Sequence, residues 1–273
     1  YEDAEIVIRG MLKSVPDSSE INHLAGITYY GLEKNGLAVS HFRMVEPNTR
    51  FYDDAVVHVA FLLHEDGKTD EAIEFLQTAV ENNPENAEFN YYLGTMYEEN
   101  ETYDLALKYL QNAVDADQEN EKYHFRLGVV HDKAGDKEAS SASMRKVIEI
   151  DPEHANALNY LGYTYADLGR NLDEAERLIK EALKHKPDDG YITDSLGWVY
   201  YKRGQYKVAL TYLKKAVSIV PDDPIMLEHL GDTYFKLNDP KNALKYYKMA
   251  LTKKEKDTQE LEEKIKRLIN STN

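Results

Sequence analysis

The sequence feature that most constrains this chain is an internal repeat. The segment Ser195–Pro221 reads SLGWVYYKRGQYKVALTYLKKAVSIVP, and similar segments begin at Tyr92, Tyr160 and His229. Each contains Leu-Gly, a Tyr three residues after the Gly, an Ala nine or ten residues further along, and another small residue seven positions after that Ala. A period of this kind indicates stacked units that bury one continuous core, because a single unit cannot bury its apolar face alone.

The repeat divides most of the chain into seven units when Leu-Gly occupies the seventh and eighth positions of each. Their ranges are 19–52, 53–86, 87–120, 121–154, 155–189, 190–223 and 224–257. Six units have 34 residues, and the fifth has 35 because of one extra residue in the turn GRNLDEA. We expect residues 1–18 to form the second helix of a truncated repeat. Residues 258–273 are expected to form a capping helix and tail.

Two helices are predicted in each unit. In the first half, apolar or small residues recur at i, i+3, i+4 and i+7, as from Leu158 to Tyr165. In the second half they recur at i, i+4, i+7 and i+8, as from Ala209 to Val217. Both patterns place one apolar face on an α-helix. Small residues at the Gly and Ala positions allow the two helices to approach closely.

Turn residues mark the ends of these helices. Four glycines lie between the two halves of a unit and suit a positive-φ helix exit: Gly67, Gly135, Gly169 and Gly204. Four prolines are predicted to stop the second helix: Pro84, Pro152, Pro187 and Pro221. The residues that follow are mostly Asp, Glu or Asn, which can cap the next helix. In the last unit, Asp239 is predicted as an N-cap with Pro240 at the first helical position.

This 34-residue helix-turn-helix resembles the tetratricopeptide repeat family over essentially the whole chain. The close match to the repeat pattern, the Tyr-rich turns and the absence of Cys resemble its bacterial branch. The resemblance implies an all-α fold, a right-handed α-α superhelix (solenoid) of about seven and a half helix-turn-helix repeats plus a C-terminal capping helix. It also implies that first helices line a concave groove, with second helices outside and no inherent active site.

The composition and motifs give no sign of enzyme chemistry. The chain has no Cys, so disulfides and thiolate sites are excluded. It has no glycine-rich phosphate loop and no HExxH motif. Its nine His residues do not show the i, i+4 spacing of a helical metal pair. We therefore expect no enzyme activity, no catalytic residues, no cofactor and no metal.

Charge is distributed unevenly along the chain. Residues 1–120 carry 24 acidic and seven basic side chains, whereas residues 121–273 carry 25 acidic and 26 basic ones. An acidic half disfavours nucleic-acid binding, because the phosphates are bound by cationic side chains. It attracts basic partners instead. The alternative is a solvated surface without a partner, and charge alone does not decide between these two interpretations.

The predicted groove supplies the candidate binding residues. The fifth, ninth and twelfth positions of the first helices are expected to face it, and they are unusually aromatic and include the only Trp. Exposed aromatic side chains are typical of peptide sites. The alternative for fifth-position aromatics such as Tyr91 and Phe125 is packing against adjacent helices. The candidates are Tyr30, Phe61, His64, Tyr91, Thr95, Glu98, Phe125, Asn159, Tyr163, Asp194, Trp198, Tyr201 and Phe235.

We predict a non-catalytic protein-protein interaction scaffold that binds an extended peptide or protein segment in an aromatic, partly acidic concave groove. Acidic residues of the first units, such as Glu98 and Glu99, favour a partner with a basic or basic-apolar segment. The alternative function is a regulatory or targeting arm of a larger multidomain protein, catalytic or not.

The predicted partners do not include nucleic acid, and direct membrane insertion is not expected because no apolar run approaches the about 18 residues of a membrane span. The chain begins at Tyr1, midway through a repeat, so we expect it to be part of a longer protein. Self-association through the exposed N-terminal repeat end is a further expectation. The protein is expected to be soluble. Its expected compartment is either the cytoplasm or the bacterial periplasm, in association with the envelope.

Overall fold

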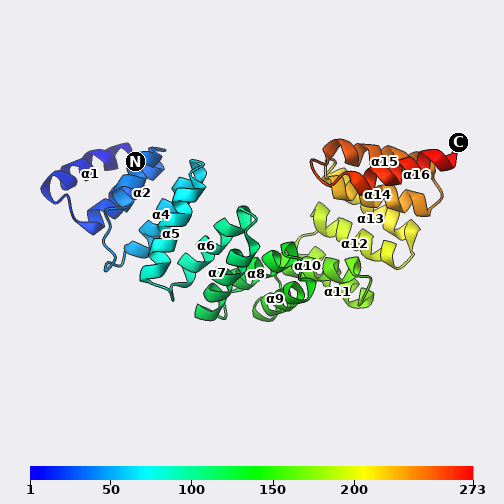
Figure 1. Ribbon diagram of the computed structural model, residues 1–273, viewed down its shortest axis with the longest axis horizontal. Coiled ribbons are helices and arrows are strands. Elements are labelled where there is room, and N and C mark those ends of the chain that lie inside the picture. The colour runs from blue at the N-terminus through cyan, green and yellow to red at the C-terminus, as the bar shows by residue number, and fades with distance from the viewer. Residues whose placement is uncertain (273) are drawn as a thin grey trace. The chain divides into compact units, whose positions relative to one another are not determined.

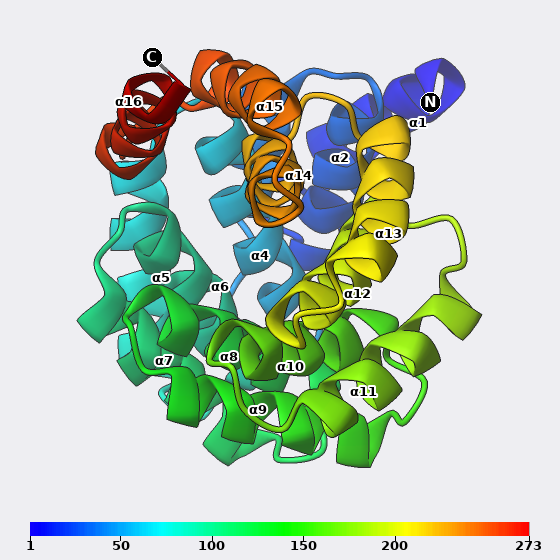
Figure 2. The ribbon, with the colours of Figure 1, turned by 90° about the vertical axis from the view of Figure 1, so that its right-hand side faces the viewer.

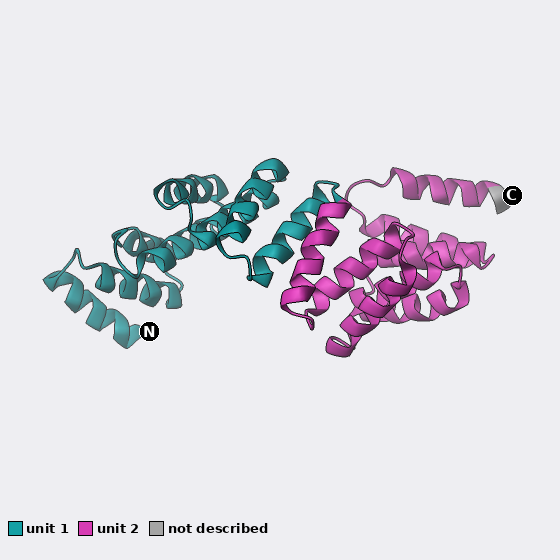
Figure 3. Cartoon of the chain, turned by 90° about the horizontal axis from the view of Figure 1, so that it is seen from below, with its two compact units in different colours: residues 1–136 teal, residues 137–273 magenta. Residues whose placement is uncertain are grey.

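The computed structural model describes residues 1–272, which form sixteen α-helices and no β-strand (Figure 1). The chain divides into two compact units, residues 1–136 (unit 1) and residues 137–273 (unit 2), shown in separate colours in Figure 3. Unit 1 contains α1 (Glu2–Ser14), α2 (Ser19–Gly31), α3 (Asn35–Phe42), α4 (Tyr52–Glu65), α5 (Thr69–Asn82), α6 (Ala87–Glu99), α7 (Tyr103–Ala116) and α8 (Glu121–Lys133). Unit 2 contains α9 (Lys137–Ile150), α10 (Ala155–Asp167), α11 (Leu172–His185), α12 (Gly190–Lys202), α13 (Tyr206–Ile219), α14 (Pro224–Lys236), α15 (Pro240–Lys253) and α16 (Gln259–Thr272).

The repeating element is a hairpin of two helices. In unit 1 the pairs are α2–α3, α4–α5 and α6–α7, and in unit 2 they are α10–α11, α12–α13 and α14–α15. Successive hairpins of one unit also contact each other, as α13 contacts α14. Figure 2 shows these two helices in yellow and orange. The all-α helix-turn-helix repeat fold predicted from the spacing is thereby confirmed.

The turn inside each hairpin uses a left-handed residue. Gly204 has φ +74°, and the N–H groups of Gly204 and Gln205 donate to the carbonyl oxygens of Tyr201 and Tyr200. This bond pattern ends an α-helix by satisfying its last carbonyl groups. The positive-φ exit predicted at the glycines is confirmed. Where a hairpin lacks the glycine, another residue takes this conformation: Glu33, Glu101 and Asn238.

The glycine of the Leu-Gly pair allows the two helices of a hairpin to touch. A Cβ atom on Gly162 of α10 would lie 2.6 Å from Ile179 Cγ1 and 3.0 Å from the carbonyl oxygen of Ala175, both on α11. Ala175 and Ile179 are themselves fully buried. The close approach predicted from the small residues is therefore confirmed, and a side chain at this glycine would push the helices apart.

Prolines and polar caps set the ends of the helices as predicted. The helix α13 ends at Ile219, two residues before Pro221, and Asp223 then accepts hydrogen bonds from the N–H groups of Ile225 and Met226 at 2.9 Å. Asp239 accepts from the N–H of Asn242 at 3.0 Å, with Pro240 as the first residue of α15. These side chains satisfy N–H groups that have no partner inside the helix.

The first full hairpin departs from the others. Its second helix, α3, has 8 residues, whereas α5 and α7 have 14 each. After α3 the chain turns, so that Val45 is buried. Pro47 disfavours helical conformation at Glu46, which precedes it. The sequence from Arg43 to Phe51 is therefore a non-helical connection to α4.

Candidate functional site

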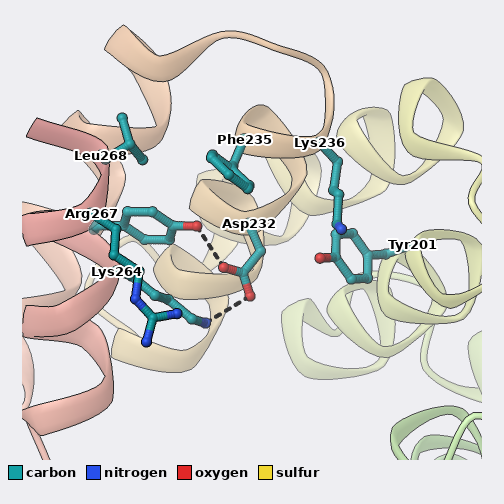
Figure 4. A pocket seen from close by; sticks show the side chains of 8 residues that line it. Tyr201, Asp232, Phe235, Lys236, Lys264, Arg267 and Leu268 are labelled. Atoms are coloured by element: carbon teal, nitrogen blue, oxygen red, sulfur yellow. Dashed lines mark hydrogen bonds and ion pairs between the residues drawn. The ribbon is translucent and has the colours of Figure 1, made fainter. Parts of the chain in front are cut away.

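Two cavities lie on unit 2 along its first helices. The smaller, which we name the Asp194 cavity, has a volume of about 210 Å³ and is bordered by α10, α12 and the start of α14. Its lining includes Asn159, Tyr160, Tyr163, Tyr191, Asp194, Ser195, Asp223, Ile225 and Met226. The larger, the Asp232 cavity, has a volume of about 490 Å³ and is lined by Tyr201, Asp232, Phe235, Lys236, Tyr247, Lys264, Arg267 and Leu268 (Figure 4).

An aromatic stack connects the two cavities. The ring centroid of Trp198 lies 3.9 Å from that of His229 and 4.5 Å from that of Tyr201, with ring planes within 14° and 6° of parallel. Tyr163, which lines the Asp194 cavity, lies with its ring centroid 6.4 Å from that of His229. The stack joins α10, α12 and α14. Trp198 and His229 are only 8% and 6% exposed, so Trp198 packs inside unit 2 rather than facing the groove as the sequence predicted, and Tyr163 and Tyr201 are the rings that reach the cavities.

Helical spacing explains why these side chains meet. Asp194, Trp198 and Tyr201 lie at i, i+4 and i+7 of α12, and residues at these intervals share one face of an α-helix. His229 and Asp232 lie three residues apart on the facing helix α14. Each first helix thus supplies one row of side chains to the same surface.

A buried polar pair lies beneath this surface. Asp194 Oδ2 accepts a hydrogen bond from His229 Nδ1 at 2.8 Å, and both side chains are less than a tenth exposed. Burial lowers the pKa of His229, but the Asp194 carboxylate together with Asp232 and Glu228 outweighs that effect, and the net pKa is raised. Asp194 Oδ1, Asn159 Oδ1 and Trp198 Nε1 are buried and have no hydrogen-bond partner among the described residues.

The Asp232 cavity contains a network of charges. Asp232 accepts hydrogen bonds from the hydroxyl of Tyr247 at 2.6 Å and from Lys264 Nζ at 3.0 Å, and Lys264 also donates to Glu228 at 2.8 Å. The two dashed lines in Figure 4 mark the bonds to Asp232. Burial lowers the pKa of Lys264, yet the two carboxylates outweigh it and hold the pKa above its usual value. Burial also raises the pKa of Tyr201 to about 12, with a further contribution from Asp232.

Beside these charged groups, Phe235 and Tyr201 form an apolar part of the cavity lining. The carboxylates of Asp232 and Glu228 are paired with Lys264, and the Tyr201 phenol is neutral near pH 7. Phe235 is 52% exposed, although exposed aromatic rings are unfavourable in water. The Asp232 cavity can therefore accept an apolar group against Phe235 and Tyr201.

The predicted groove residues of unit 1 form a looser group. Tyr30 and Phe61 are both exposed, and their rings meet edge to face with centroids 6.5 Å apart. His64 Nε2 lies 3.0 Å from a Glu99 carboxylate oxygen. Thr95 is half-buried, and its hydroxyl donates to the carbonyl oxygen of Tyr91 within α6.

Two other predicted residues of unit 1 pack inside it. Tyr91 is 5% exposed and packs against Tyr92 and Tyr123, with ring centroids 5.3 and 5.1 Å away. This is the packing that was the alternative for fifth-position aromatics. Phe125, the other fifth-position aromatic, is half-buried on α8.

Glu98 differs from the accessible acid that the sequence suggested. Its side chain is 3% exposed, and its carboxylate pairs with Arg126 at 3.2 Å and Lys133 at 3.0 Å. The charge of Glu98 is thus already neutralised within unit 1. Glu99, the next residue, remains exposed beside His64.

Several residues of the site were absent from the sequence-based candidates. His229 precedes Leu230-Gly231 directly, and its position in the repeat is one that packs against the neighbouring first helix. The equivalent positions of the other units are varied and include Leu24, Arg126 and Ser195, so the repeat gave no signal for it. Lys264 and Arg267 belong to α16, which has no counterpart in the other units, so no periodic signal marks them.

The described part of the chain gives no structural indication of metal or membrane chemistry. Among its His, Asp and Glu residues, no group of three or more is placed to hold a metal ion. None of the helices in residues 1–272 is long and apolar enough to cross a membrane.

Comparison with known proteins places this architecture in a family. A family model described as the cilia and flagella-associated protein 70 C-terminal domain matches residues 32–266. The TPR repeat-containing protein PA4667 of Pseudomonas aeruginosa is 48% identical over 63 residues, which are 23% of this chain. The matched segment spans 11% of that relative's length.

Solved structures show the same fold. A tetratricopeptide repeat protein from Parabacteroides merdae superposes with a TM-score of 0.69 at 14% identity, over 92% of this chain and 98% of the other. YrrB, described as a TPR protein with an unusual peptide-binding site, gives a TM-score of 0.55 at 25% identity, over 63% of this chain and 89% of the other. Because the family match covers nearly all of the helical hairpins described above, the chain belongs to the tetratricopeptide repeat family, within the group represented by the cilia and flagella-associated protein 70 C-terminal domain.

Proposed function

We propose that this chain is a non-catalytic interaction scaffold and that unit 2 binds an extended peptide or protein segment across α10, α12 and α14. The observation that carries the proposal is the stack of Trp198 between His229 and Tyr201, which connects the Asp194 and Asp232 cavities. The buried stack holds Tyr201 and Tyr163 at the two cavities, and aromatic side chains in recessed surfaces are the usual source of binding energy in protein interfaces.

An extended segment suits this surface better than a small molecule does. Alternate side chains of an extended chain point the same way, so a segment that crosses the stack can place side chains in both cavities. The likeness to YrrB, whose description includes a peptide-binding site, supports the same proposal.

The test is to select peptides on the intact chain and to compare variants. The labelled chain is applied to an array of random, end-blocked heptapeptides. The affinity of the peptide that binds it most tightly is then measured by fluorescence anisotropy. Tyr201→Ala and Phe235→Ala remove side chains that line the Asp232 cavity. Val208→Ala is the matched control, because Val208 is an exposed apolar residue on α13 that lines neither cavity.

We expect each of Tyr201→Ala and Phe235→Ala to weaken the peptide by about tenfold, the usual effect of removing one aromatic contact at the centre of an interface. The affinity of Val208→Ala should equal that of the unchanged chain. Equal affinities for all four proteins, with unchanged helical circular dichroism, would show that unit 2 does not bind peptides at this surface.

A further inference from the structure

The Asp194 cavity contains buried acceptors without partners. Asp194 Oδ2 is bonded to His229, but Asp194 Oδ1 has no partner among the described residues, and the side chain is only 7% exposed. Asn159 Oδ1, on the neighbouring helix α10, is also buried without one. Buried polar atoms in native proteins nearly always have a hydrogen-bond partner, so two such acceptors at one cavity indicate that a donor binds there.

The other lining residues define the charge of that donor. Three tyrosines and two carboxylates line the cavity, and none of its described lining residues is Lys, Arg or His. One oxygen of the second carboxylate, Asp223, caps α14. Tyrosine rings attract cations through their negative faces, and carboxylates do so by charge. Asp194 is paired with His229, but a neutral N–H donor in the cavity would leave the Asp223 carboxylate uncompensated.

We propose that the Asp194 cavity is a subsite for a lysine or arginine side chain of the segment that unit 2 binds. This inference rests on the proposed function and names the side chain that the partner must carry. An ammonium group has three donors and a guanidinium group has five, so either can bond Asp194 Oδ1 and Asn159 Oδ1 together. The aliphatic part of the side chain would lie against Tyr163 and Met226.

The subsite gives the partner segment a defined pattern. The cationic residue occupies the Asp194 cavity, and an apolar residue occupies the Asp232 cavity beside Phe235 and Tyr201. The basic-apolar partner expected from the sequence is retained, but its recognition is placed in unit 2. In unit 1 the expected acid Glu98 is already bonded to Arg126 and Lys133.

The test uses an array of blocked heptapeptides with lysine, arginine, norleucine, citrulline or glutamate at the centre and random residues elsewhere. Norleucine and citrulline keep the approximate size of the lysine and arginine side chains without their charge. Comparing each basic peptide with its neutral analogue therefore shows whether the cavity prefers an ammonium or a guanidinium group. We expect the labelled chain to be retained by lysine or arginine peptides, with at least about tenfold tighter binding than the neutral analogue of the same peptide.

Variants of the chain then show which side chains cause the preference for cationic peptides. Asp194→Asn keeps the shape of the side chain, and Asn159→Leu removes the second acceptor at a half-buried position, so the two give independent tests if one folds poorly. In each, the advantage of the cationic peptide over its neutral analogue should fall to about threefold or less. Asp188→Asn is the charge control, because Asp188 is exposed and lies in the turn before α12. It should keep the full advantage.

Each outcome has one meaning. If peptides bind through Tyr201 and Phe235 but cationic and neutral peptides bind equally, the subsite is wrong and the proposed function stands. The subsite is also wrong if the cationic advantage survives in both Asp194→Asn and Asn159→Leu. If no peptide depends on Tyr201 and Phe235, the proposed function fails and the subsite fails with it.

Discussion

Asp194 and His229 lie 35 residues apart in the sequence, and a 2.8 Å hydrogen bond joins Asp194 Oδ2 to His229 Nδ1 within unit 2. The bond links α12 to α14, so it connects two successive hairpins of the repeat. His229 also stacks on Trp198, at the centre of the proposed binding surface. The stability of this surface is therefore coupled to the protonation of one imidazole.

We expect this pair to make folding depend on pH. The folded-state pKa of His229 is raised above its ordinary value of about 6.5, so the folded protein binds the proton more tightly than the unfolded chain. The resulting stabilisation is complete below pH about 6.5 and is lost as the pH rises through the raised pKa. Besides Asp194, the carboxylates of Glu228 and Asp232 on α14 contribute to the shift.

The measurement is the urea midpoint of the unchanged chain and of His229→Asn at several pH values. The difference between the two proteins should be largest below pH about 6.5 and should shrink toward pH 9. Comparing the two proteins cancels the titration of groups that do not interact with His229. A difference that stays constant across this range would mean that His229 is not charged in the folded state.

Lys264 is predicted to hold α16 against α14. Its ammonium group bonds Glu228 and Asp232, so Lys264→Met leaves the half-buried Asp232 without a cation and Glu228 with only the longer contact to Lys254 at 3.5 Å. We expect this change to cost about 2 kcal/mol, less than for a fully buried pair because Lys264 keeps some solvent contact. Amide hydrogens of α16 should exchange faster with solvent.

The matched control is Lys266→Met, because Lys266 is an exposed residue of the same helix. Its exchange rates should equal those of the unchanged chain. The same exchange profile in both variants would show that the Lys264 network does not fix α16. The expected result would support the proposal that residues 258–273 cap the last repeat.

Gly162→Ala is predicted to destabilise the α10–α11 hairpin. The new methyl group would lie within 3.0 Å of both the Ala175 carbonyl oxygen and Ile179. We expect a loss of about 1–3 kcal/mol in the free energy of unfolding, as for other overpacked cores. Gly10→Ala in α1 is the control, because nothing lies within 4 Å of a Cβ atom there and alanine favours helix by about 1 kcal/mol. If the two substitutions had the same effect, close packing would not explain the glycine of the repeat.

Glu101→Gly is predicted to stabilise the α6–α7 turn. Glu101 has φ +56°, a left-handed conformation that costs a residue with a side chain about 1–2 kcal/mol. Glycine avoids that cost but loses more entropy on folding, so the expected net gain is up to about 1 kcal/mol. Gly204→Ala is the reciprocal change at φ +74° in open space and should cost about 1 kcal/mol. Thermal unfolding measures both, and a lower midpoint for Glu101→Gly would contradict this explanation.

Much of the fold could be predicted from the spacing of residues, because each feature depends on local backbone or on one neighbouring helix. The left-handed exit at Gly204, the cap at Asp239 and the close contact at Gly162 are of this kind. The shortened α3 was not predicted, because the burial of Val45 depends on the path of the chain after the helix.

The candidate site could be predicted only in part. Spacing placed Asn159 and Asp194 on the groove side, and the structure brings both to one cavity. Periodicity does not tell which polar atoms find partners, so the pairing of Glu98 with Arg126 could not be read from the sequence. The contact of Lys264 with Asp232 could not be predicted from the sequence either, because α16 is not part of a repeat and has no pattern to align.

The most direct test of the proposed binding surface is the fluorescence of Trp198 during a peptide titration. Trp198 is the only Trp in the chain, and it lies between the two cavities, so its emission reports on this surface alone. The tightest peptide from the array should change that emission, with the same dissociation constant that anisotropy gives. The double variant Tyr30→Ala, Phe61→Ala, which alters exposed rings of unit 1, should behave like the unchanged chain. A peptide that binds by anisotropy without any change in Trp198 emission would contradict the account.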